Sequence, residues 1–157
     1  AMLRAELDRL SPEWRERLEA GPEGVQAMLA VLPTLSSDML LRPFFEAYAI
    51  AADVLAAHGA EVAPESRRWL DECMGLGRQY ELQRRLAHPE SVSRHLFATG
   101  LELARHRGLC EADVTAAARM EFAARLKAVL RRLDTVHAIA VRRVEAALAT
   151  RTVPAQP

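Results

Sequence analysis

Histidine is the residue type in this sequence best suited to acid and base chemistry, because its pKa lies close to neutral pH. The five histidines are His58, His88, His95, His106 and His137. No two of them stand three or four residues apart, the spacing that two zinc ligands need on one helix. Four fall at expected helix ends or beside an apolar stripe, which favours a structural role. His95 follows two serines, Ser91 and Ser93, on one expected helix and is the strongest functional candidate of the five.

Other catalytic and binding patterns are missing from the sequence. It contains no glycine-rich phosphate loop, nucleophile elbow or acidic metal-binding cluster. The two cysteines, Cys73 and Cys110, are far apart and match no disulfide or metal pattern, which is typical of reduced thiols in a cytosolic protein. Basic and acidic residues are equal at 21 each, and no aromatic residues interleave the arginine pairs. We therefore expect no cofactor, no metal and no nucleic-acid partner.

The composition indicates the elements that hold these residues. Half of the 157 residues are hydrophobic but only 5% are aromatic, and alanine, leucine and arginine dominate. This is the composition of packed helices rather than of sheets. The sequence predicts an all-α fold, a single-domain bundle of about five to seven helices around one core.

Proline and glycine divide the first half of the chain. Ser11 and Pro12 read as a cap and a first helical residue, and Pro22 opens a further short helix. An apolar stripe then predicts a core helix within residues 40–57, which ends at Gly59. Pro43 is expected to be tolerated only if regular helix begins just before it. The stripe consists of Leu41, Phe45, Tyr48, Ala52 and Leu55.

Three further helices are expected in the second half. Pro64 opens one that runs to about Arg85, and two glycines in its middle, Gly75 and Gly77, suggest close approach of another helix or of a ligand. The next runs from Pro89 to Gly108. The last, over residues 111–149, lacks internal proline and glycine and should be the longest.

These patterns predict three regions. Residues 1–37 form short N-terminal helices that pack on the core, residues 38–149 form the helical core domain, and residues 150–157 form a frayed tail. No apolar run approaches the roughly 18 residues that cross a bilayer, so we expect this chain to be soluble and cytoplasmic.

Three phrases in the sequence resemble one known family. They are the run from Arg42 to Tyr48 (RPFFEAY), the run from Leu76 to Tyr80 (LGRQY), and the run from Glu90 to Ser93 (ESVS). In this order and with these intervals, they look like the helical region that follows the catalytic domain in bacterial glycerol-3-phosphate acyltransferases, particularly actinobacterial ones. The similarity covers residues 40–109 well and the final helix loosely.

The resemblance implies a reaction carried out by another part of such an enzyme. Members of the family transfer an acyl group from acyl-CoA or acyl carrier protein to the sn-1 hydroxyl of glycerol 3-phosphate in phospholipid synthesis, and the complete enzyme is expected at the cytoplasmic face of the membrane. Their catalytic histidine belongs to an H-x-x-x-x-D motif. Here no histidine has an aspartate five residues later; the nearest approach is His106 with Glu111. The resemblance therefore implies a C-terminal accessory domain, inactive alone, whose partner is the acyltransferase catalytic domain.

Several polar residues lie inside the otherwise apolar phrases. We interpret them as buried ion pairs within the domain or as contacts with the catalytic domain, and we predict that Arg78→Ala destabilises the chain. Direct binding of glycerol phosphate or the acyl group by these residues is the rival interpretation. A second hypothesis for the whole chain is a stand-alone interaction module that forms a homodimer. The candidate positions are Arg42, Glu46, Arg78, Gln79, Glu90 and Ser93.

Overall fold

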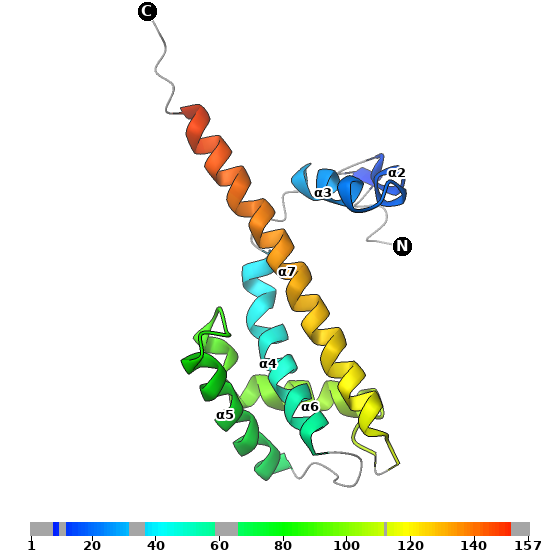
Figure 1. The fold of residues 1–157 in the computed structure, drawn as a ribbon, viewed down its shortest axis with the longest axis vertical. Helices are drawn as coiled ribbons and strands as arrows, with labels where there is room; N and C mark the ends of the chain where they lie inside the picture. The colour runs from blue at the N-terminus through cyan, green and yellow to red at the C-terminus, as the bar shows by residue number, and fades with distance from the viewer. Residues whose placement is uncertain (1–7, 10–11, 32–36, 59–65, 112, 152–157) are drawn as a thin grey trace, which may run out of the picture. The chain divides into compact units, whose positions relative to one another are not determined.

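The computed structural model describes residues 8–9, 12–31, 37–58, 66–111 and 113–151, and in this part of the chain helices joined by turns and short loops are present, without strands (Figure 1). The all-α prediction is confirmed. The elements, in chain order, are α2 (Trp14–Glu19), α3 (Pro22–Val31), α4 (Ser37–Ala57), α5 (Ser66–Leu82), the 3₁₀ turn η1 (Pro89–Ser91), α6 (Arg94–His106) and α7 (Ala116–Arg151).

The chain falls into two compact units. One, the terminal unit, consists of residues 1–38 and 133–157, and the other, the central unit, consists of residues 39–132. The chain therefore passes from one unit to the other twice, near the start of α4 and within α7. The packing of residues 1–37 on the core, and the single core domain over residues 38–149, stay predictions.

Two short helices make up the described N-terminal part of the terminal unit. Pro22 opens α3 as expected, after Gly21, whose φ of 79° is a conformation that glycine adopts without strain. α2 begins at Trp14, two residues later than expected, because Pro12 and Glu13 form a turn. Leu3, Leu7 and Ser11 lie outside the described residues. The indole N–H of Trp14 donates to Asp8 Oδ1 at 2.8 Å, which holds the start of α2.

The central unit is organised around α4, which packs on two sides. Alanines on α4 keep side chains short, so that neighbouring helices approach closely. One buried cluster joins α4 to α5 and α6; it contains Ala47, Ile50, Ala51, Val54, Trp69, Cys73, Phe97 and Leu101. The other joins α4 to α6 and the first turns of α7; it contains Ala49, Ala52, Leu55, Ala104, Phe122, Ala123 and Leu126.

Glycines mark two of the helix contacts. A Cβ atom on Gly77 of α5 would lie 3.2 Å from Phe97 Cζ, so the expected close approach is confirmed at this position. At Gly75 a Cβ atom would meet nothing within 4 Å, so the expectation is wrong there. On α6, a Cβ on Gly100 would lie 3.1 Å from Ala51 Cβ. The absence of a side chain at Gly77 and Gly100 therefore allows α6 to pack closely against α5 and α4.

The start of α4 differs from expectation. The helix begins at Ser37, so Pro43 lies inside it rather than at its first turn. Proline lacks the N–H for the bond to the residue four positions earlier, and the packing of the following turns must offset that loss. Leu41, expected on the core face, is 46% exposed, because burial on α4 begins only at Glu46.

Two of the later helices begin at other residues than expected. The helix expected from Pro89 is interrupted: η1 ends at Ser91 and α6 begins only at Arg94. α7 begins five residues later than expected, at Ala116, and continues without interruption to Arg151, which confirms the long last helix. In the described parts of the chain, no helix is both long enough and apolar enough to cross a membrane.

Candidate functional site

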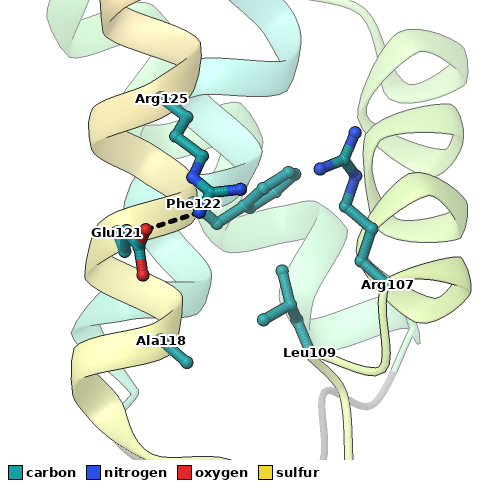
Figure 2. A pocket seen from close by; sticks show the side chains of 6 residues that line it. All are labelled: Arg107, Leu109, Ala118, Glu121, Phe122 and Arg125. Carbon is teal, nitrogen blue, oxygen red and sulfur yellow. Dashed lines mark hydrogen bonds and ion pairs between the residues drawn. The ribbon is translucent and has the colours of Figure 1, made fainter.

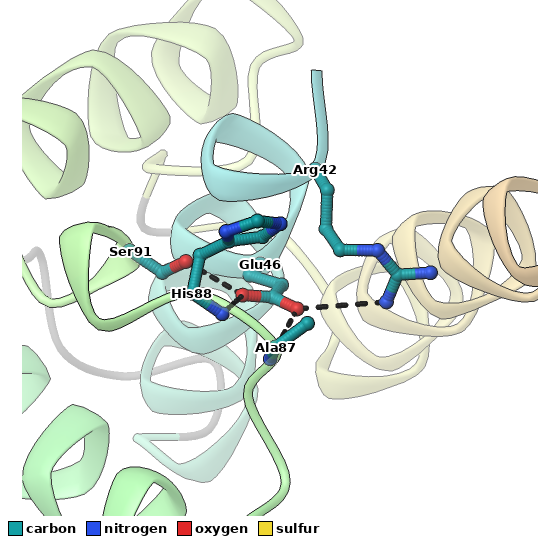
Figure 3. Close-up of polar contacts among 5 residues, drawn as sticks. All are labelled: Arg42, Glu46, Ala87, His88 and Ser91. Carbon is teal, nitrogen blue, oxygen red and sulfur yellow. Dashed lines mark hydrogen bonds and ion pairs between the residues drawn. The ribbon is translucent and has the colours of Figure 1, made fainter. Parts of the chain in front are cut away.

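A buried carboxylate lies at the centre of a polar cluster in the central unit (Figure 3). Glu46 on α4 is 3% exposed. The backbone N–H of Ala87 donates to its Oε1 at 2.9 Å, the N–H of His88 donates to Oε2 at 3.3 Å, and Ser91 Oγ donates to Oε2 at 2.6 Å. Arg42, one turn earlier on α4, adds an ion pair with 3.6 Å between Nη1 and Oε1. These five residues are the Glu46 cluster, which ties α4 to the segment between α5 and α6.

The local sequence explains why this segment presents its backbone to Glu46. Arg84, just after α5, has a φ of 54°, a left-handed conformation that turns the chain. His88 is extended, with φ −129° and ψ 121°, as expected for a residue before proline. Pro89 then opens η1. The adjacent N–H groups of residues 87 and 88 thus lie outside any helix, and the carboxylate satisfies both.

The chemistry available to the Glu46 cluster is structural. A buried charge is stable only when paired and hydrogen-bonded, and both oxygens of Glu46 already accept bonds from donors of the chain. Ser91 is fully buried and its hydroxyl donates to Glu46, so it is not presented to a substrate as a nucleophile. The cluster therefore holds the segment that precedes α6 in one conformation against α4.

The predicted site residues lie in different environments in the structure. Arg42 and Glu46 pair within the central unit, as one of the two interpretations expected. Glu90, in η1, is exposed, and Ser93 occupies the N-cap position of α6 without a side-chain capping bond. Their assignment as contacts to another domain stays a prediction.

Arg78 and Gln79 do not fit the buried interpretation. Both are exposed, because the packed face of α5 carries Trp69, Cys73 and Gly77 instead. The expected buried ion pair of Arg78 is wrong, and with it the reason for a large loss of stability in Arg78→Ala. Contact with another domain remains as the prediction for these two side chains.

A second polar cluster was missed by the sequence interpretation. Asp53 on α4 accepts a bond of 3.1 Å from the Tyr80 hydroxyl on α5 and an ion pair of 2.6 Å from Lys127 on α7. Burial, followed by the neighbouring Asp53 carboxylate, raises the pKa of Tyr80. Arg85 lies over the Tyr80 ring at 3.7 Å from its centroid. The sequence did single out Lys127, which is the sole lysine of the chain. Its contact with Asp53 could not be predicted, because the two residues lie far apart in the sequence and share no helical repeat.

The histidines do not converge on a reactive centre in the described residues. His95, His106 and His137 are exposed, and His58 pairs with Glu72 of α5. Burial raises the pKa of Glu72, but the bonds from His58 and Arg68 outweigh it and the net pKa is lowered. The described part of the chain contains no group of three potential metal ligands among histidine, cysteine and acidic side chains.

The cysteines are free thiols, as the sequence predicts. Burial raises the pKa of Cys73 to about 12. Burial also raises the pKa of Cys110, which follows the end of α6. Because the thiolate is the reactive form of cysteine, neither environment favours a nucleophile at neutral pH.

Comparison with known proteins gives one consistent match. The sequence model of the glycerol-3-phosphate acyltransferase C-terminal region matches residues 2–113. Proteins named "Putative acyltransferase plsB1" from Mycobacterium bovis and from the CDC 1551 and H37Rv strains of Mycobacterium tuberculosis are each 42% identical over 126 residues. The aligned part is 78% of this chain and 20% of each relative, so the chain spans about one fifth of their length. No solved structure matches.

Proposed function

This chain belongs to the family formed by the C-terminal region of glycerol-3-phosphate acyltransferases, and on that premise we propose that it serves as the docking partner of an acyltransferase catalytic domain. The observation that carries the proposal is the family match over residues 2–113 together with the small share of each relative that the chain spans. The chain is the helical C-terminal part of such an enzyme without the catalytic part. In the proposal, the catalytic domain supplies the H-x-x-x-x-D histidine.

The chemistry of the described residues supports this non-catalytic role. The buried serine and carboxylate of the Glu46 cluster bind each other, and Asp53 is occupied by Tyr80 and Lys127. General acid and base catalysis needs a titratable group within reach of substrate. In the Glu46 cluster and around Asp53, the polar groups instead bind one another and connect neighbouring helices and loops.

The proposed contact surface is the start of α4. Four large apolar side chains there are exposed: Met39, Leu40, Leu41 and Phe44, at 55%, 69%, 46% and 44%. Exposed apolar side chains grouped on one segment are typical of protein–protein interaction sites. We assign this apolar segment of α4 to the catalytic domain, with the exposed polar positions Arg78, Gln79 and Glu90 as further candidate contacts.

For the complete enzyme, the proposal follows the family. The catalytic domain transfers an acyl group from acyl-CoA or acyl carrier protein to the sn-1 hydroxyl of glycerol 3-phosphate, at the cytoplasmic face of the membrane. The present chain contacts neither acyl donor directly in this proposal. Its contribution is to stabilise the catalytic domain in its active conformation.

Reconstitution tests the proposal. The purified chain is mixed with a separately expressed catalytic domain of a mycobacterial relative, and acyl transfer to labelled glycerol 3-phosphate is measured for each part and for the mixture. We expect no transfer by the chain alone and higher transfer by the mixture than by the catalytic domain alone. Transfer by the chain alone, or a mixture no more active than the catalytic domain, contradicts the proposal.

Two variants locate the contact. Leu40→Glu places a charge in the apolar segment of α4 at a position 69% exposed, so it should abolish binding without unfolding the chain. Met120→Glu is the matched control, because Met120 is 63% exposed on α7, beside the residues that pack against the C-terminal half of α4. Isothermal titration with the catalytic domain should show loss of binding for the first variant and not for the second.

The homodimer is the second candidate function, and the same exposed segment favours it. A self-sufficient dimer would bury these four side chains against a second copy. Analytical ultracentrifugation distinguishes the two proposals. A concentration-dependent dimer that Leu40→Glu dissociates, without any effect of the catalytic domain, would replace docking by self-association.

A further inference from the structure

A cavity of about 340 Å³ lies between the end of α6 and the first turns of α7, apart from both polar clusters (Figure 2). Its volume falls within the roughly 300–1,000 Å³ range of small-molecule sites. Arg107, the C-cap residue of α6, and Leu109 line it from one side. The remaining lining residues belong to α7 and are Ala118, Glu121, Phe122 and Arg125.

The cavity combines an apolar wall with two guanidinium groups. In Figure 2 the Phe122 ring lies between the side chains of Arg107 and Arg125, with Leu109 beside it. The guanidinium carbon of Arg107 lies 5.7 Å from the centroid of the Phe122 ring. A ring contact of this kind occupies the face of a guanidinium and leaves the N–H donors at its edge available.

The charges of the lining residues do not cancel. Arg125 forms an ion pair of 2.5 Å with Glu121, four residues earlier on α7. Among the described residues, Arg107 forms no ion pair with its side chain, so the cavity keeps one net positive charge. Arg107 is also exposed, so an anion in solution can reach it.

We infer that this cavity binds a small phosphomonoester. Arginine recognises oxyanions through parallel N–H bonds. A phosphomonoester has three terminal oxygens, so it can accept two bonds from Arg107 and another from Arg125, which a carboxylate with two oxygens does less well. The Phe122 and Leu109 side chains contact the organic part of the ligand. This inference is independent of docking to a catalytic domain, because every residue in it belongs to this chain.

Binding to the isolated chain tests the inference, by isothermal titration with inorganic phosphate and with butyl phosphate. We expect butyl phosphate to bind more tightly, because its alkyl group buries apolar surface against Leu109, which is only partly buried. Arg107→Gln should weaken binding about tenfold or more, since it removes a charge-assisted pair. The control is Arg132→Gln, an exposed arginine two turns after Arg125 on the same helix that does not line the cavity. It should leave binding unchanged.

A gain of affinity gives the sharper result, because an unfolded variant cannot produce it. Glu121→Gln removes the carboxylate that occupies Arg125 and raises the net charge of the cavity. We expect binding to tighten by a few fold. Absence of phosphate binding, or an equal loss in Arg107→Gln and Arg132→Gln, would overturn the inference, and so would weaker binding by Glu121→Gln.

Vesicles distinguish the source of the phosphomonoester. Phosphatidylcholine vesicles containing phosphatidic acid present this group on a lipid, and vesicles with phosphatidylglycerol present a phosphodiester of similar charge. Binding to the first kind alone, lost in Arg107→Gln, assigns the site to a lipid headgroup. Binding of butyl phosphate without vesicle binding assigns it to a free metabolite. Either result supports the site.

Discussion

Glu46 and Glu121 look alike as a local pattern and differ in the folded chain. Each is paired with an arginine four residues away, Arg42 in one case and Arg125 in the other. Glu46 is 3% exposed and also accepts bonds from Ala87, His88 and Ser91, whereas the side chain of Glu121 is 63% exposed. A buried carboxylate holds the fold because its loss leaves donors unsatisfied. An exposed one contributes little to stability, because water can replace its partner.

The largest predicted effect tests this difference directly. Glu46→Gln replaces an acceptor with an amide whose NH₂ group faces backbone N–H donors, and we expect about 3–5 kcal/mol of lost unfolding free energy. Glu121→Gln, the same change in an exposed pair, should cost under about 1 kcal/mol. Urea denaturation of both variants and the wild type measures the two values. Equal losses would show that burial of the carboxylate does not decide its contribution.

Asp53 should fall between these two cases. It has two partners, Tyr80 and Lys127, and its side chain is 14% exposed. Asp53→Asn keeps an oxygen for the Tyr80 hydroxyl but loses the charge that attracts Lys127, whose side chain is 44% exposed and can return to water. We expect a loss of about 1.5–3 kcal/mol. The measurement is again the denaturation midpoint.

A double-mutant cycle with Lys127→Met identifies the source of that loss. If the ion pair contributes, the double variant loses less stability than the two single variants together. Additive losses would mean that the Tyr80 bond, rather than the Lys127 pair, carries the contribution of Asp53.

The two glycines of α5 give a second comparison between a buried and an exposed position, here for an added side chain rather than a charge. Gly77→Ala places a Cβ 3.2 Å from both Phe97 Cζ and Val92 Cγ1, and we expect it to destabilise the chain by about 1–3 kcal/mol. Gly75→Ala meets open space within a helix and should stabilise by up to about 1 kcal/mol. Thermal unfolding of the two variants should therefore shift in opposite directions. A shift in the same direction for both would contradict the role of Gly77 in the crossing of α5 and α6.

The sequence predicts features that depend on local pattern, but not those that depend on how distant helices meet. The helical class, the long α7 and the family resemblance follow from composition, periodicity and phrases within one segment, and all three are confirmed. The Asp53 contacts join residues 27 or more positions apart, and the partners of Glu46 include backbone groups, which have no signature in the sequence. The cavity beside Arg107 likewise depends on how α6 meets α7. Helical spacing alone does not distinguish Gly75 from Gly77, or Glu121 from Glu46.

Substitution of Arg78 has the smallest predicted effect on stability. It is also a strict test of the idea that exposed charged side chains contribute little to stability. Because α5 directs this side chain to solvent, Arg78→Ala should change the free energy of unfolding of the isolated chain by no more than about 0.5 kcal/mol. If Arg78 contacts the catalytic domain, the same variant should weaken binding in the titration while its unfolding midpoint is unchanged. A large loss of stability would show instead that Arg78 supports this unit, and would remove it from the proposed interdomain surface. Unchanged stability together with unchanged binding would leave Leu40 and its apolar neighbours as the determinants of docking.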